Sequence, residues 1–404
     1  MLAYDNKSRH ILIYIDVMER YRFFIRFLKP IEALGYQVSI ITNKLLIYLI
    51  LRLKGYSVYL LKRSNVAIKQ NIRRNLQYSL SVLTHYHSYD EARRIYSNTY
   101  YFCEAIHQKV PISDLFIFNG TTTIASAVGD FAKEYNLRSY FFEISNLGAK
   151  IFVDKEGVNA KSYLFNHPQI LDGVAVDEEA YQTWRKAWMA NYTLPPQKAN
   201  TTKLPLSFLI DWIGFTLFFA IREDQRSIVK VLRKKFLLKK RNSYTTAIDL
   251  LPKRFIFLAL QVTDDSQLVL NSDVDNLQAL TYAKELAYKY KYDLVVKLHP
   301  AEADTTFIEQ IENMSKNGDF ILTDALTHLL IERSQKVVVI NSTVGLESKI
   351  LQKDVEVLGR AFYQSFDQKR VRAYIMDYLI DIDYFDTNAS VDTKELKRIF
   401  AKHA

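Results

Sequence analysis

The sequence has few of the residues that mark a secreted, metal-binding or membrane-spanning protein. Its single cysteine in 404 residues, Cys103, excludes an intrachain disulfide and fits a reducing cytoplasm. No carboxylates or histidines cluster with the spacing of metal ligands, so we expect no metal and no other cofactor. Residues 1–10 are polar and lead into a strand-like run, without the pattern of a signal peptide. We therefore expect a cytoplasmic protein.

A long apolar run, residues 206–221, is too short to cross a bilayer. It contains Asp211 and falls short of the roughly twenty residues that a transmembrane helix needs. A buried helix is the favoured interpretation, and a contact with a membrane surface is the alternative. The basic cluster from Arg233 to Arg241 follows, with Phe and Leu among its cations. It fits either a solvated helix face or docking on anionic lipid at the cytoplasmic face of the inner membrane.

The composition is that of a folded protein with an acidic partner. Hydrophobic residues make up 49% and charged residues 24%, and most of the 27 Tyr and 24 Phe are expected in cores. The net charge of +10 favours nucleic acid, anionic lipid or a substrate that carries phosphate or carboxylate. Because no nucleic-acid motif is present, we favour the last two.

Apolar runs alternate with helical patterns in two series, which predicts two doubly wound α/β domains. In the first series, Gly35 is expected to end the first helix. Residues 65–109 lack glycine and proline and predict two helices. The predicted domains are 1–170, a helical connector over 171–250, 251–365, and closing helices over 366–404. The predicted strands are 10–16, 37–42, 57–61, 114–118 and 139–142 in the first series, and 255–262, 293–298, 336–340 and 356–359 in the second.

Polar clusters follow three strands of the second series. Residues 263–267, His299 and residues 341–347 come directly after apolar runs. In open α/β sheets, ligands bind outside the carboxyl ends of the strands. These clusters therefore predict a binding site at one edge of the second sheet.

Each candidate residue also has an ordinary structural interpretation. The stretch 341–347 suits a phosphate at a helix N-terminus, but Asn-Ser-Thr is also common capping chemistry. Asp265 either caps a helix or acts as a nucleophile or base, and spacing alone does not decide. His299 is as often structural as functional in such a position. Glu143, at the end of a first-series strand, would by default be a solvated loop acid.

The order of these motifs resembles the bacterial capsule polysaccharide synthesis family. The matching stretches are 260–267, 296–300, 340–347 and 358–363, with Phe142-Glu143 and residues 156–162 upstream. Order and approximate spacing agree over residues 114–365, well over half of the chain. Members with this pattern are retaining β-Kdo transferases of the Kps type. They have the GT-B architecture, in which two Rossmann-like domains face each other across a cleft, and they use CMP-Kdo.

The resemblance implies a role for each candidate. Asp265 becomes the expected nucleophile and Glu143 the expected acid/base, with His299 also in the catalytic set. The acceptor would lie near Asn119, Thr121 and Asn159. Binding of the CMP-Kdo donor, a phosphate ester of an acidic sugar, is assigned to Gln261, Ser266, Gln267, Lys297, His299, Asn341, Ser342, Thr343, Gly345 and Glu347.

The first half of the chain departs from the family pattern. The family often has an Asp, with an Arg close behind, where this chain has Asn119-Gly120-Thr121. It also often has Glu-x-Gly-Tyr-x-Arg, whereas Glu143 is followed here by Ile-Ser-Asn-Leu-Gly. These changes leave the donor chemistry intact and leave the acceptor open, as a saccharide or lipid-linked saccharide of capsule or O-antigen. The alternatives are a transferase for another nucleotide sugar and a non-catalytic capsule assembly or export subunit.

Overall fold

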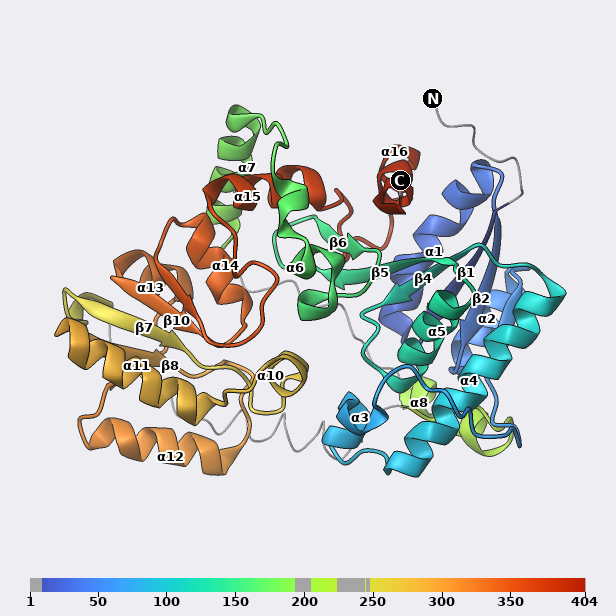
Figure 1. Ribbon diagram of the computed structural model, residues 1–404, viewed down its shortest axis with the longest axis horizontal. Coiled ribbons are helices and arrows are strands. Elements are labelled where there is room, and N and C mark those ends of the chain that lie inside the picture. Colours follow the sequence, from blue (N-terminus) through green and yellow to red (C-terminus); the bar gives the residue numbers. More distant parts are fainter. Residues whose placement is uncertain (1–8, 193–204, 224–243, 245–247, 404) are drawn as a thin grey trace. The chain divides into compact units, whose positions relative to one another are not determined.

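The computed structural model describes residues 9–192, 205–223, 244 and 248–403, which form two compact units (Figure 1). Of these residues, the first unit contains 9–163, 205–223 and 378–403. The second contains 164–192, 244 and 248–377. The basic cluster from Arg233 to Arg241 lies outside the described residues. Each unit is built on its own sheet.

The first sheet has six strands in the order β3-β2-β1-β4-β5-β6. All neighbours are parallel except β5 and β6, which are antiparallel. The chain changes direction across the sheet between β1 and β4, so the switch point lies there. The strands are β1 (His10–Ile15), β2 (Gln37–Thr42), β3 (Val58–Leu60), β4 (Asp114–Phe118), β5 (Arg138–Ile144) and β6 (Ile151–Asp154).

Helices cover both faces of this sheet. One face packs on rings from α1, such as Phe23, Phe24 and Phe27, and on the C-terminal helix α16. The other face packs against α4 and α5 (Figure 1). The helices of this unit are α1 (Met18–Ala33), α2 (Leu45–Leu53), α3 (Leu80–Leu83), α4 (Tyr89–Lys109), α5 (Thr123–Glu134), α8 (Pro205–Thr216) and α16 (Thr393–Phe400), with short 3-10 turns at Leu76–Tyr78, Asn159–Lys161 and Ala401–His403.

The second sheet has five parallel strands in the order β11-β10-β7-β8-β9. Its switch point lies between β7 and β10, which are hydrogen-bonded neighbours. The core on one face is mainly aliphatic, and α11 and α12 supply much of it. The strands are β7 (Phe255–Ala259), β8 (Asp293–Lys297), β9 (Ile321–Leu322), β10 (Lys336–Val339) and β11 (Val355–Val357).

Figure 1 shows α11 and α12 on one side of this sheet, with α13 and α14 on the other. The short α6 (Tyr163–Asn166) links the two units. The remaining elements of the second unit are α7 (Glu178–Tyr192), α10 (Ser266–Asn271), α11 (Asn276–Tyr290), α12 (Thr305–Lys316), α13 (Thr327–Arg333), α14 (Thr343–Ile350), α15 (Gln368–Ala373), the π-helix Tyr374–Tyr378, and 3-10 turns at Pro168–Leu171 and Ile248–Leu250.

The two doubly wound α/β units confirm the predicted fold class, but the segments that build them differ from the predicted domains. Residues 378–403 return to the first sheet, because Tyr384 and Phe400 pack into its aromatic core. The expected connector 171–250 is divided: α7 belongs to the second unit and α8 to the first. The sequence does not show to which unit residues 378–403, α7 and α8 belong, because this depends on contacts between residues far apart along the chain.

Three local predictions need correction or refinement. Residues 65–109 contain the two expected helices, but α3 has only four residues and α4 has 21. The irregular segment before α3 is held by Arg74, whose guanidinium binds Asp130 at 2.6–2.7 Å. Strand β5 runs on through Glu143 to Ile144, because it pairs with β6. Helix α8 is not buried, since Leu209 and Trp212 are more than half exposed. Among the described helices, none is long and apolar enough to cross a membrane.

Candidate functional site

The loops after β7 and β10 meet at the switch point of the second sheet and are bound to each other. Gln261 and Asn341 are both buried. Gln261 Nε2 donates to Asn341 Oδ1, and the backbone N–H of Asn341 donates to Gln261 Oε1, each at 2.9 Å. Asn341 Nδ2 also donates to the carbonyl of Gln267 at 2.9 Å. The structure therefore uses Gln261 and Asn341 to position the two loops, with their side-chain groups occupied inside the protein.

Asp265 lies in the loop after β7 and caps α10. Its Oδ1 accepts a hydrogen bond from the backbone N–H of Gln267 at 2.6 Å. The side chain is half-buried, and Ser266 begins the helix behind it. Glu302, which is buried, joins this loop to the one after β8 by accepting a hydrogen bond from the Thr263 N–H at 2.8 Å. The cap fixes the carboxylate at the carboxyl end of β7, where a ligand at the switch point would lie.

The N-terminus of α14 follows β10 at the same edge. Ser342 is its N-cap and accepts a hydrogen bond from the Val344 N–H at 3.0 Å, and Thr343 is exposed. A Cβ on Gly345 would lie 2.5 Å from the hydroxyl oxygen of Tyr363. That hydroxyl donates to the Ser342 carbonyl. Gly345 is therefore needed for the close approach of Tyr363, which holds the helix start in place.

Lys297 and His299 are at the end of β8, next to β7 in the sheet. Lys297 Nζ donates to the Ala325 carbonyl at 2.7 Å and to Thr327 Oγ1 at 3.0 Å. His299 is exposed, and its Nδ1 accepts from the Ala301 N–H at 3.0 Å. In the neutral ring the proton is then assigned to Nε2, which can donate. Both cation-forming side chains thus come to the edge that carries Asp265 and the start of α14.

Glu347 in α14 has an unusual environment that the sequence did not reveal. Burial raises the pKa of its carboxyl to about 7, while the hydrogen bond from Tyr192 and the nearby charge of Lys297 act in the opposite direction. Tyr192 is at the end of α7, and its ring packs edge-on against His328. Sequence reasoning missed Tyr192 and His328, because neither lies near the strand-end motifs along the chain.

The first sheet has its own polar cluster at the carboxyl ends of β1, β4 and β5. Arg20 Nη1 binds Asp16 at 2.5 Å, and these two residues follow β1. Burial by itself would lower the pKa of Arg20. The nearby carboxylates of Asp16 and Glu143 outweigh burial and raise this pKa above its ordinary value. Glu143 accepts hydrogen bonds from Asn119 Nδ2 and, at 2.9 Å, from the Ile144 N–H. These contacts give Glu143 a fixed place, unlike a solvated loop acid.

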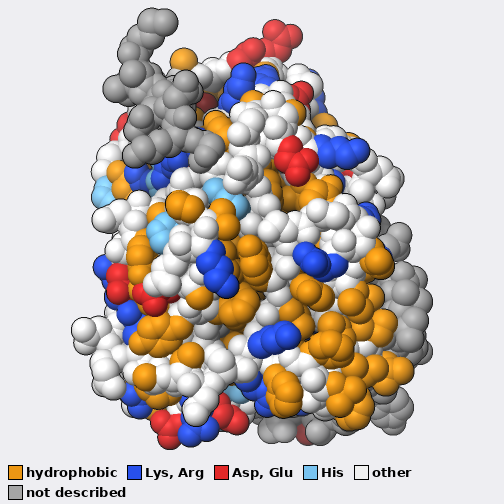
Figure 2. Space-filling view, turned by 90° about the vertical axis from the view of Figure 1, so that its right-hand side faces the viewer, with side chains coloured by type: hydrophobic (Ala, Val, Ile, Leu, Met, Phe, Trp, Pro, Cys, Tyr) orange, Lys and Arg blue, Asp and Glu red, His pale blue; other side chains and the backbone are white. Residues whose placement is uncertain are grey.

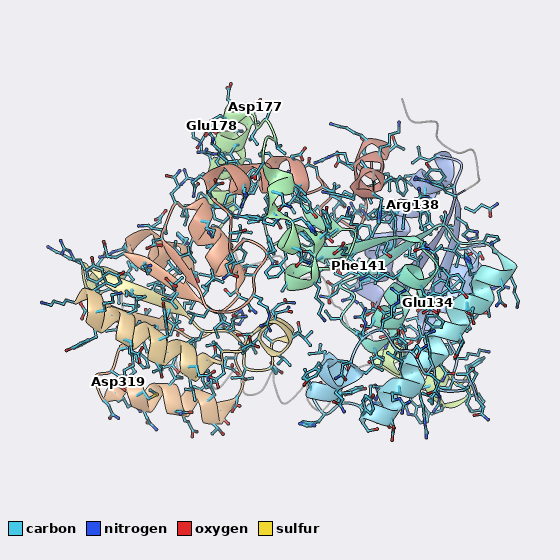
Figure 3. All side chains as sticks on the ribbon, viewed as in Figure 1. Glu134, Arg138, Phe141, Asp177, Glu178 and Asp319 are labelled. Atoms are coloured by element: carbon cyan, nitrogen blue, oxygen red, sulfur yellow. The ribbon has the colours of Figure 1, made fainter. Side chains whose placement is uncertain are left out.

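The turn after β4 presents Asn119 and Thr121 to this cluster. Asn119 and Gly120 both have positive φ, at 65° and 79°. A Cβ on Gly120 would lie 2.8 Å from the ring of Phe141, which β5 places beside α5 (Figure 3). The Thr121 hydroxyl donates to Asn119 Oδ1. The structure therefore joins Asn119 and Thr121 to Glu143 through a chain of hydrogen bonds.

A buried acid, Glu223, completes the cluster and was absent from the sequence prediction. Its Oε1 accepts from the backbone N–H of Ile124 at 2.8 Å, at the start of α5. Burial raises the pKa of Glu223 to about 8, with the charge of Asp16 acting in the same direction. Glu223 lies about a hundred positions after α5 in the chain. No local pattern could therefore have indicated the contact.

Asn159 is placed away from the β1–β4 switch point. It has a φ of 53° in a 3-10 turn after β6, at the edge of the sheet. Asp154 organises this turn, because its Oδ1 accepts from the N–H groups of Glu156 and Tyr163 at 2.8 and 2.9 Å. Asn159 therefore belongs to a structural turn rather than to the cluster around Glu143.

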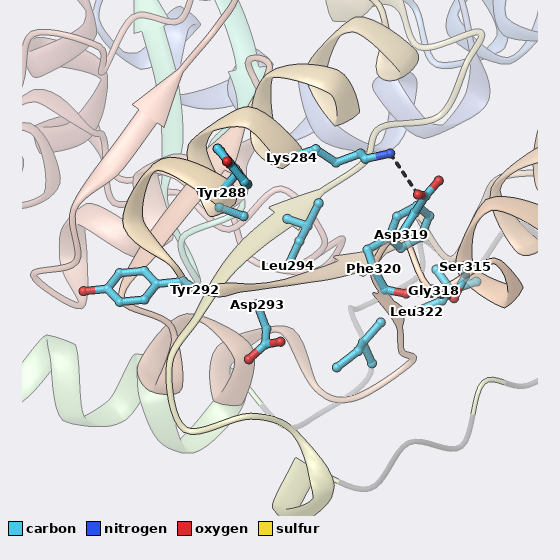
Figure 4. Close-up of a pocket in the computed structure, with 12 residues that line it drawn as sticks. Lys284, Tyr288, Tyr292, Asp293, Leu294, Ser315, Gly318, Asp319, Phe320 and Leu322 are labelled. Atoms are coloured by element: carbon cyan, nitrogen blue, oxygen red, sulfur yellow. Dashed lines mark hydrogen bonds and ion pairs between the residues drawn. The ribbon is translucent and has the colours of Figure 1, made fainter.

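A hollow of about 650 Å³ lies elsewhere in the second unit, at the amino ends of the strands (Figure 4). Asp293, the first residue of β8, lines it together with Tyr288 and Tyr292. Lys284 and Asp319 form an ion pair of 3.1 Å at its side. Because ligands of such sheets bind at the carboxyl ends, this hollow is not part of the candidate site.

Comparison with known proteins decides the family. The sequence model described as "Capsule polysaccharide biosynthesis protein" matches residues 127–366, more than half of the chain. The chain belongs to this family. The matched stretch includes Glu143, Asp265 and the whole segment 341–347, whereas Asp16, Arg20 and Asn119 lie before it. The second-unit switch point thus lies wholly within the match, and most of the first-unit cluster lies outside it.

Individual relatives are more distant. The chain is 28% identical over 287 residues to the capsule polysaccharide export protein KpsS of Escherichia coli, covering 64% of this chain and 70% of that protein. The KpsC β-Kdo 2,7 transferase of Thermosulfurimonas dismutans is 14% identical, with 98% of both chains covered and a TM-score of 0.48. The UDP-GlcNAc 2-epimerase of Methanocaldococcus jannaschii is 12% identical, with 97% and 98% covered and a TM-score of 0.31. At these TM-scores the structural similarities carry no weight for function.

The described residues of this chain provide few ligands for a metal ion. Within the part of the chain that the structure describes, no group of three or more His, Cys, Asp or Glu side chains is arranged to hold a metal ion. The second-unit switch point offers instead a helix N-terminus, Lys297 and His299. Such groups bind an anion directly.

Proposed function

We propose that this member of the capsule family is a retaining glycosyltransferase that moves β-Kdo from CMP-Kdo to a saccharide acceptor of capsule, O-antigen or a related surface polysaccharide. The observation that carries the proposal is the arrangement at the second switch point. Asp265 after β7 and the start of α14 after β10 come from adjacent strands, so one ligand at this edge meets both.

The donor is expected to bind through its phosphate. The first turn of α14 presents backbone N–H groups and the hydroxyls of Ser342 and Thr343, and Lys297 brings a cation to the same edge. His299 donates from Nε2 to the phosphate or to the sugar carboxylate. These groups can balance the donor's negative charge without a metal, so we expect that a chelator leaves turnover unchanged.

Transfer would then proceed by double displacement. The Asp265 carboxylate attacks the anomeric carbon, the bond to the phosphate oxygen breaks, and CMP leaves with the electron pair. The acceptor hydroxyl next attacks the same carbon and breaks the ester to Asp265. Glu143 takes the hydroxyl proton, and two successive inversions retain the configuration.

The first-unit cluster supports the role of a general base for Glu143. Asn119 and the Ile144 N–H donate to its two oxygens, a pattern that suits an ionised carboxylate. Asp16 Oδ1 is buried and has no hydrogen-bond partner among the described residues. A buried acceptor of this kind suits a hydroxyl of a bound saccharide.

The deciding experiment offers the purified chain CMP-Kdo, or UDP-sugars in its place, together with capsule oligosaccharide. We expect turnover of CMP-Kdo only, and an intact-mass increase of one Kdo on a Glu143→Gln variant that is slowed in the second step. The adduct should map to Asp265. Turnover of a UDP-sugar would show a different donor on the same fold.

The name of the Escherichia coli relative, a capsule polysaccharide export protein, favours a second candidate. A non-catalytic export or assembly subunit would bind partners without consuming any nucleotide sugar. Absence of turnover with every donor, together with no CMP contact at Ser342 and Thr343 in a crystal soaked with CMP, would establish that alternative. Cytidine bound in the first unit would also contradict the proposed donor site.

A further inference from the structure

Helix α8 is apolar on its outer side as well as its inner side. The inner side packs on α2: Ile210 and Ile213 contact a small core that includes Leu45, and a Cβ on Gly214 would lie 2.7 Å from the Cβ of Leu45. The outer side carries Leu209 and Trp212, which are 54% and 59% exposed. A surface helix of a soluble protein normally turns polar residues outward, so this outer side needs a partner.

The turn after α8 extends the exposed apolar surface. Leu217, Phe218 and Phe219 are 70%, 45% and 59% exposed. Phe219 has a φ of 54°, a conformation that is strained for a bulky residue. The turn is nonetheless held in place, because the Phe219 carbonyl accepts from the Arg63 N–H at 2.7 Å and Ile221 N–H donates to the Leu61 carbonyl at 3.1 Å.

Helix α2 contributes a third row to the same surface. Leu45, Leu49 and Leu53 are spaced four residues apart and so lie along one side of the helix. Leu45 is covered by α8 at Gly214, whereas Leu49 and Leu53 are 43% and 89% exposed. The row therefore runs out from under α8 into solvent. We call the surface formed by Leu49, Leu53, Leu209, Trp212, Leu217, Phe218 and Phe219 the α2–α8 face.

The exposed charges within the two chain segments that build the α2–α8 face are all positive. In residues 43–63 and 205–223 the exposed charged side chains are Arg52, Lys54, Lys62, Arg63 and Arg222. The two acids in these stretches are turned inward: Asp211 accepts a hydrogen bond from the Leu46 N–H at 3.5 Å, and Glu223 is buried. Figure 2 shows hydrophobic side chains gathered on this side of the protein, with Lys and Arg side chains among them.

We propose that the α2–α8 face docks on an anionic lipid bilayer. The apolar side chains enter the boundary between headgroups and acyl chains, where Trp and Phe are favoured, and the cations bind lipid phosphates. Twelve residues are too few to cross the bilayer, so α8 lies along its surface. The membrane alternative in the sequence involved 206–221 and Arg233–Arg241. This face instead takes one of its three rows from α2, and four of its five cations, Arg52, Lys54, Lys62 and Arg63, from α2 and the segment that follows it.

The test is flotation of the full chain with vesicles of phosphatidylcholine, with and without phosphatidylglycerol. We expect binding only to the anionic vesicles. Binding should weaken as salt rises, since the Debye length falls from about 10 Å at 0.1 M to about 3 Å at 1 M. Replacing Arg52 and Lys54 by Gln should reduce the partition coefficient about five-fold for each cation. Equal loss from Lys289→Gln with Lys316→Gln, two exposed cations of the second unit, would overturn the assignment.

Two apolar variants separate docking from folding. Trp212→Gln changes an outward-facing side chain and should lower the partition coefficient by about ten-fold or more with an unchanged melting temperature. Phe219→Asn should also weaken binding, yet should preserve or raise stability, because Asn tolerates positive φ better than Phe. The matched control is Tyr288→Gln in the second unit, where the side chain is 89% exposed. Unchanged flotation of both Trp212→Gln and Phe219→Asn would overturn the proposal.

A second copy of the chain is the competing occupant. If anionic vesicles do not bind, and sedimentation shows a dimer that Trp212→Gln dissociates, the α2–α8 face is a self-interface and lipid docking is wrong. Docking of the α2–α8 face on lipid would bring a lipid-linked acceptor close to the enzyme, and in this respect it rests on the proposed function. The docking and the transferase activity can nevertheless be refuted independently. CMP binding and turnover of a soluble acceptor test the donor site, whereas flotation tests the face.

Discussion

The two sheets have matching strand orders around their switch points, yet the side chains placed there differ in charge. The first switch point gathers three acids, Asp16, Glu143 and Glu223, around one cation, Arg20. The second sets Asp265 near a helix N-terminus and Lys297, with two further acids, the buried Glu302 in the adjoining loop and Glu347 in α14. An acid-rich edge disfavours a phosphate and suits hydroxyl groups, whereas a helix start with a cation favours the phosphate. The same topology can thus serve a donor in one unit and an acceptor in the other.

The largest expected effect comes from removing Asp265, the acid of the second switch point that we assign as nucleophile. Asp265→Asn keeps a capping side chain for α10, because Asn caps helices as well as Asp does. It removes the nucleophile, so turnover should fall about 10³-fold or more while CMP affinity stays close to the wild-type value. Steady-state kinetics and calorimetry with CMP measure the two.

Asp264→Asn is the matched control for that variant, since Asp264 is the exposed neighbour in the same turn. It should retain nearly full activity. Equal losses in the two variants, or full activity of Asp265→Asn, would remove Asp265 from the mechanism and make its role that of a helix cap.

The second effect concerns the acid of the first switch point that we assign to proton transfer. Glu143→Gln should lower turnover about 10²-fold or more and leave CMP affinity unchanged, because general bases typically contribute 10²–10⁴-fold. Glu134→Gln, in α5 of the same unit, is the control. A Glu143→Gln variant that weakens CMP binding but turns over normally would assign the donor to the first unit. That result would contradict our assignment of the donor to the second unit.

The third effect is on stability and depends on pH. The pKa of Glu223 is raised from 4.5 to about 8, so the folded chain holds the proton more tightly than the unfolded chain. Its contribution to the free energy of unfolding is therefore complete below about pH 4.5 and is lost as pH rises towards 8. Glu223→Gln should reduce that loss by an amount on the order of a few kcal/mol.

Urea unfolding at a series of pH values checks this effect, with Glu32→Gln, an exposed acid of α1, as the control. Glu347→Gln should remove a similar loss in the second unit, ending near pH 7 because the pKa of Glu347 is about 7. A pH dependence that is unchanged by Glu223→Gln would show that this carboxyl is ionised in the folded chain.

The smallest effect concerns the hydrogen bond that Tyr192 donates to the buried carboxyl of Glu347. Tyr192→Phe removes a hydrogen bond that lowers the pKa of Glu347, so that pKa should rise above about 7. The cost in stability should be about 1 kcal/mol. Carboxyl NMR titration measures the pKa, and Tyr181→Phe on the same helix is the control. A lower pKa of Glu347 in Tyr192→Phe would contradict the contact.

Much of the fold could be predicted because the signals were local. Residues 37–42 and 114–118 form strands with the bounds expected from their apolar patterns. Gly35 follows the last turn of α1 with a φ of 79°, as a helix-ending glycine should. Of the two helices predicted over 65–109, α4 has 21 residues but α3 has only four, because absence of glycine and proline permits a helix without requiring one.

The candidate site divides in the same way. The strand-end motifs located Asp265, Lys297, Ser342 and Glu347, since polar residues after buried strands meet at one edge of a parallel sheet. They did not show that Gln261 and Asn341 bind each other, or that Gly345 makes room for Tyr363. Those contacts join residues from different loops, and their geometry depends on how the strands are ordered.

By itself, the sequence determined the class of fold, the elements that alternate along it and the resemblance to the capsule family, because these depend on periodicity and on motif order. Only the tertiary structure placed Glu223 at the start of α5, Tyr192 on Glu347, and α8 against α2 with its outer side exposed. Each of these contacts joins residues 99 or more positions apart. Burial and the resulting pKa values depend on such long-range contacts, so no local pattern in the sequence encodes them.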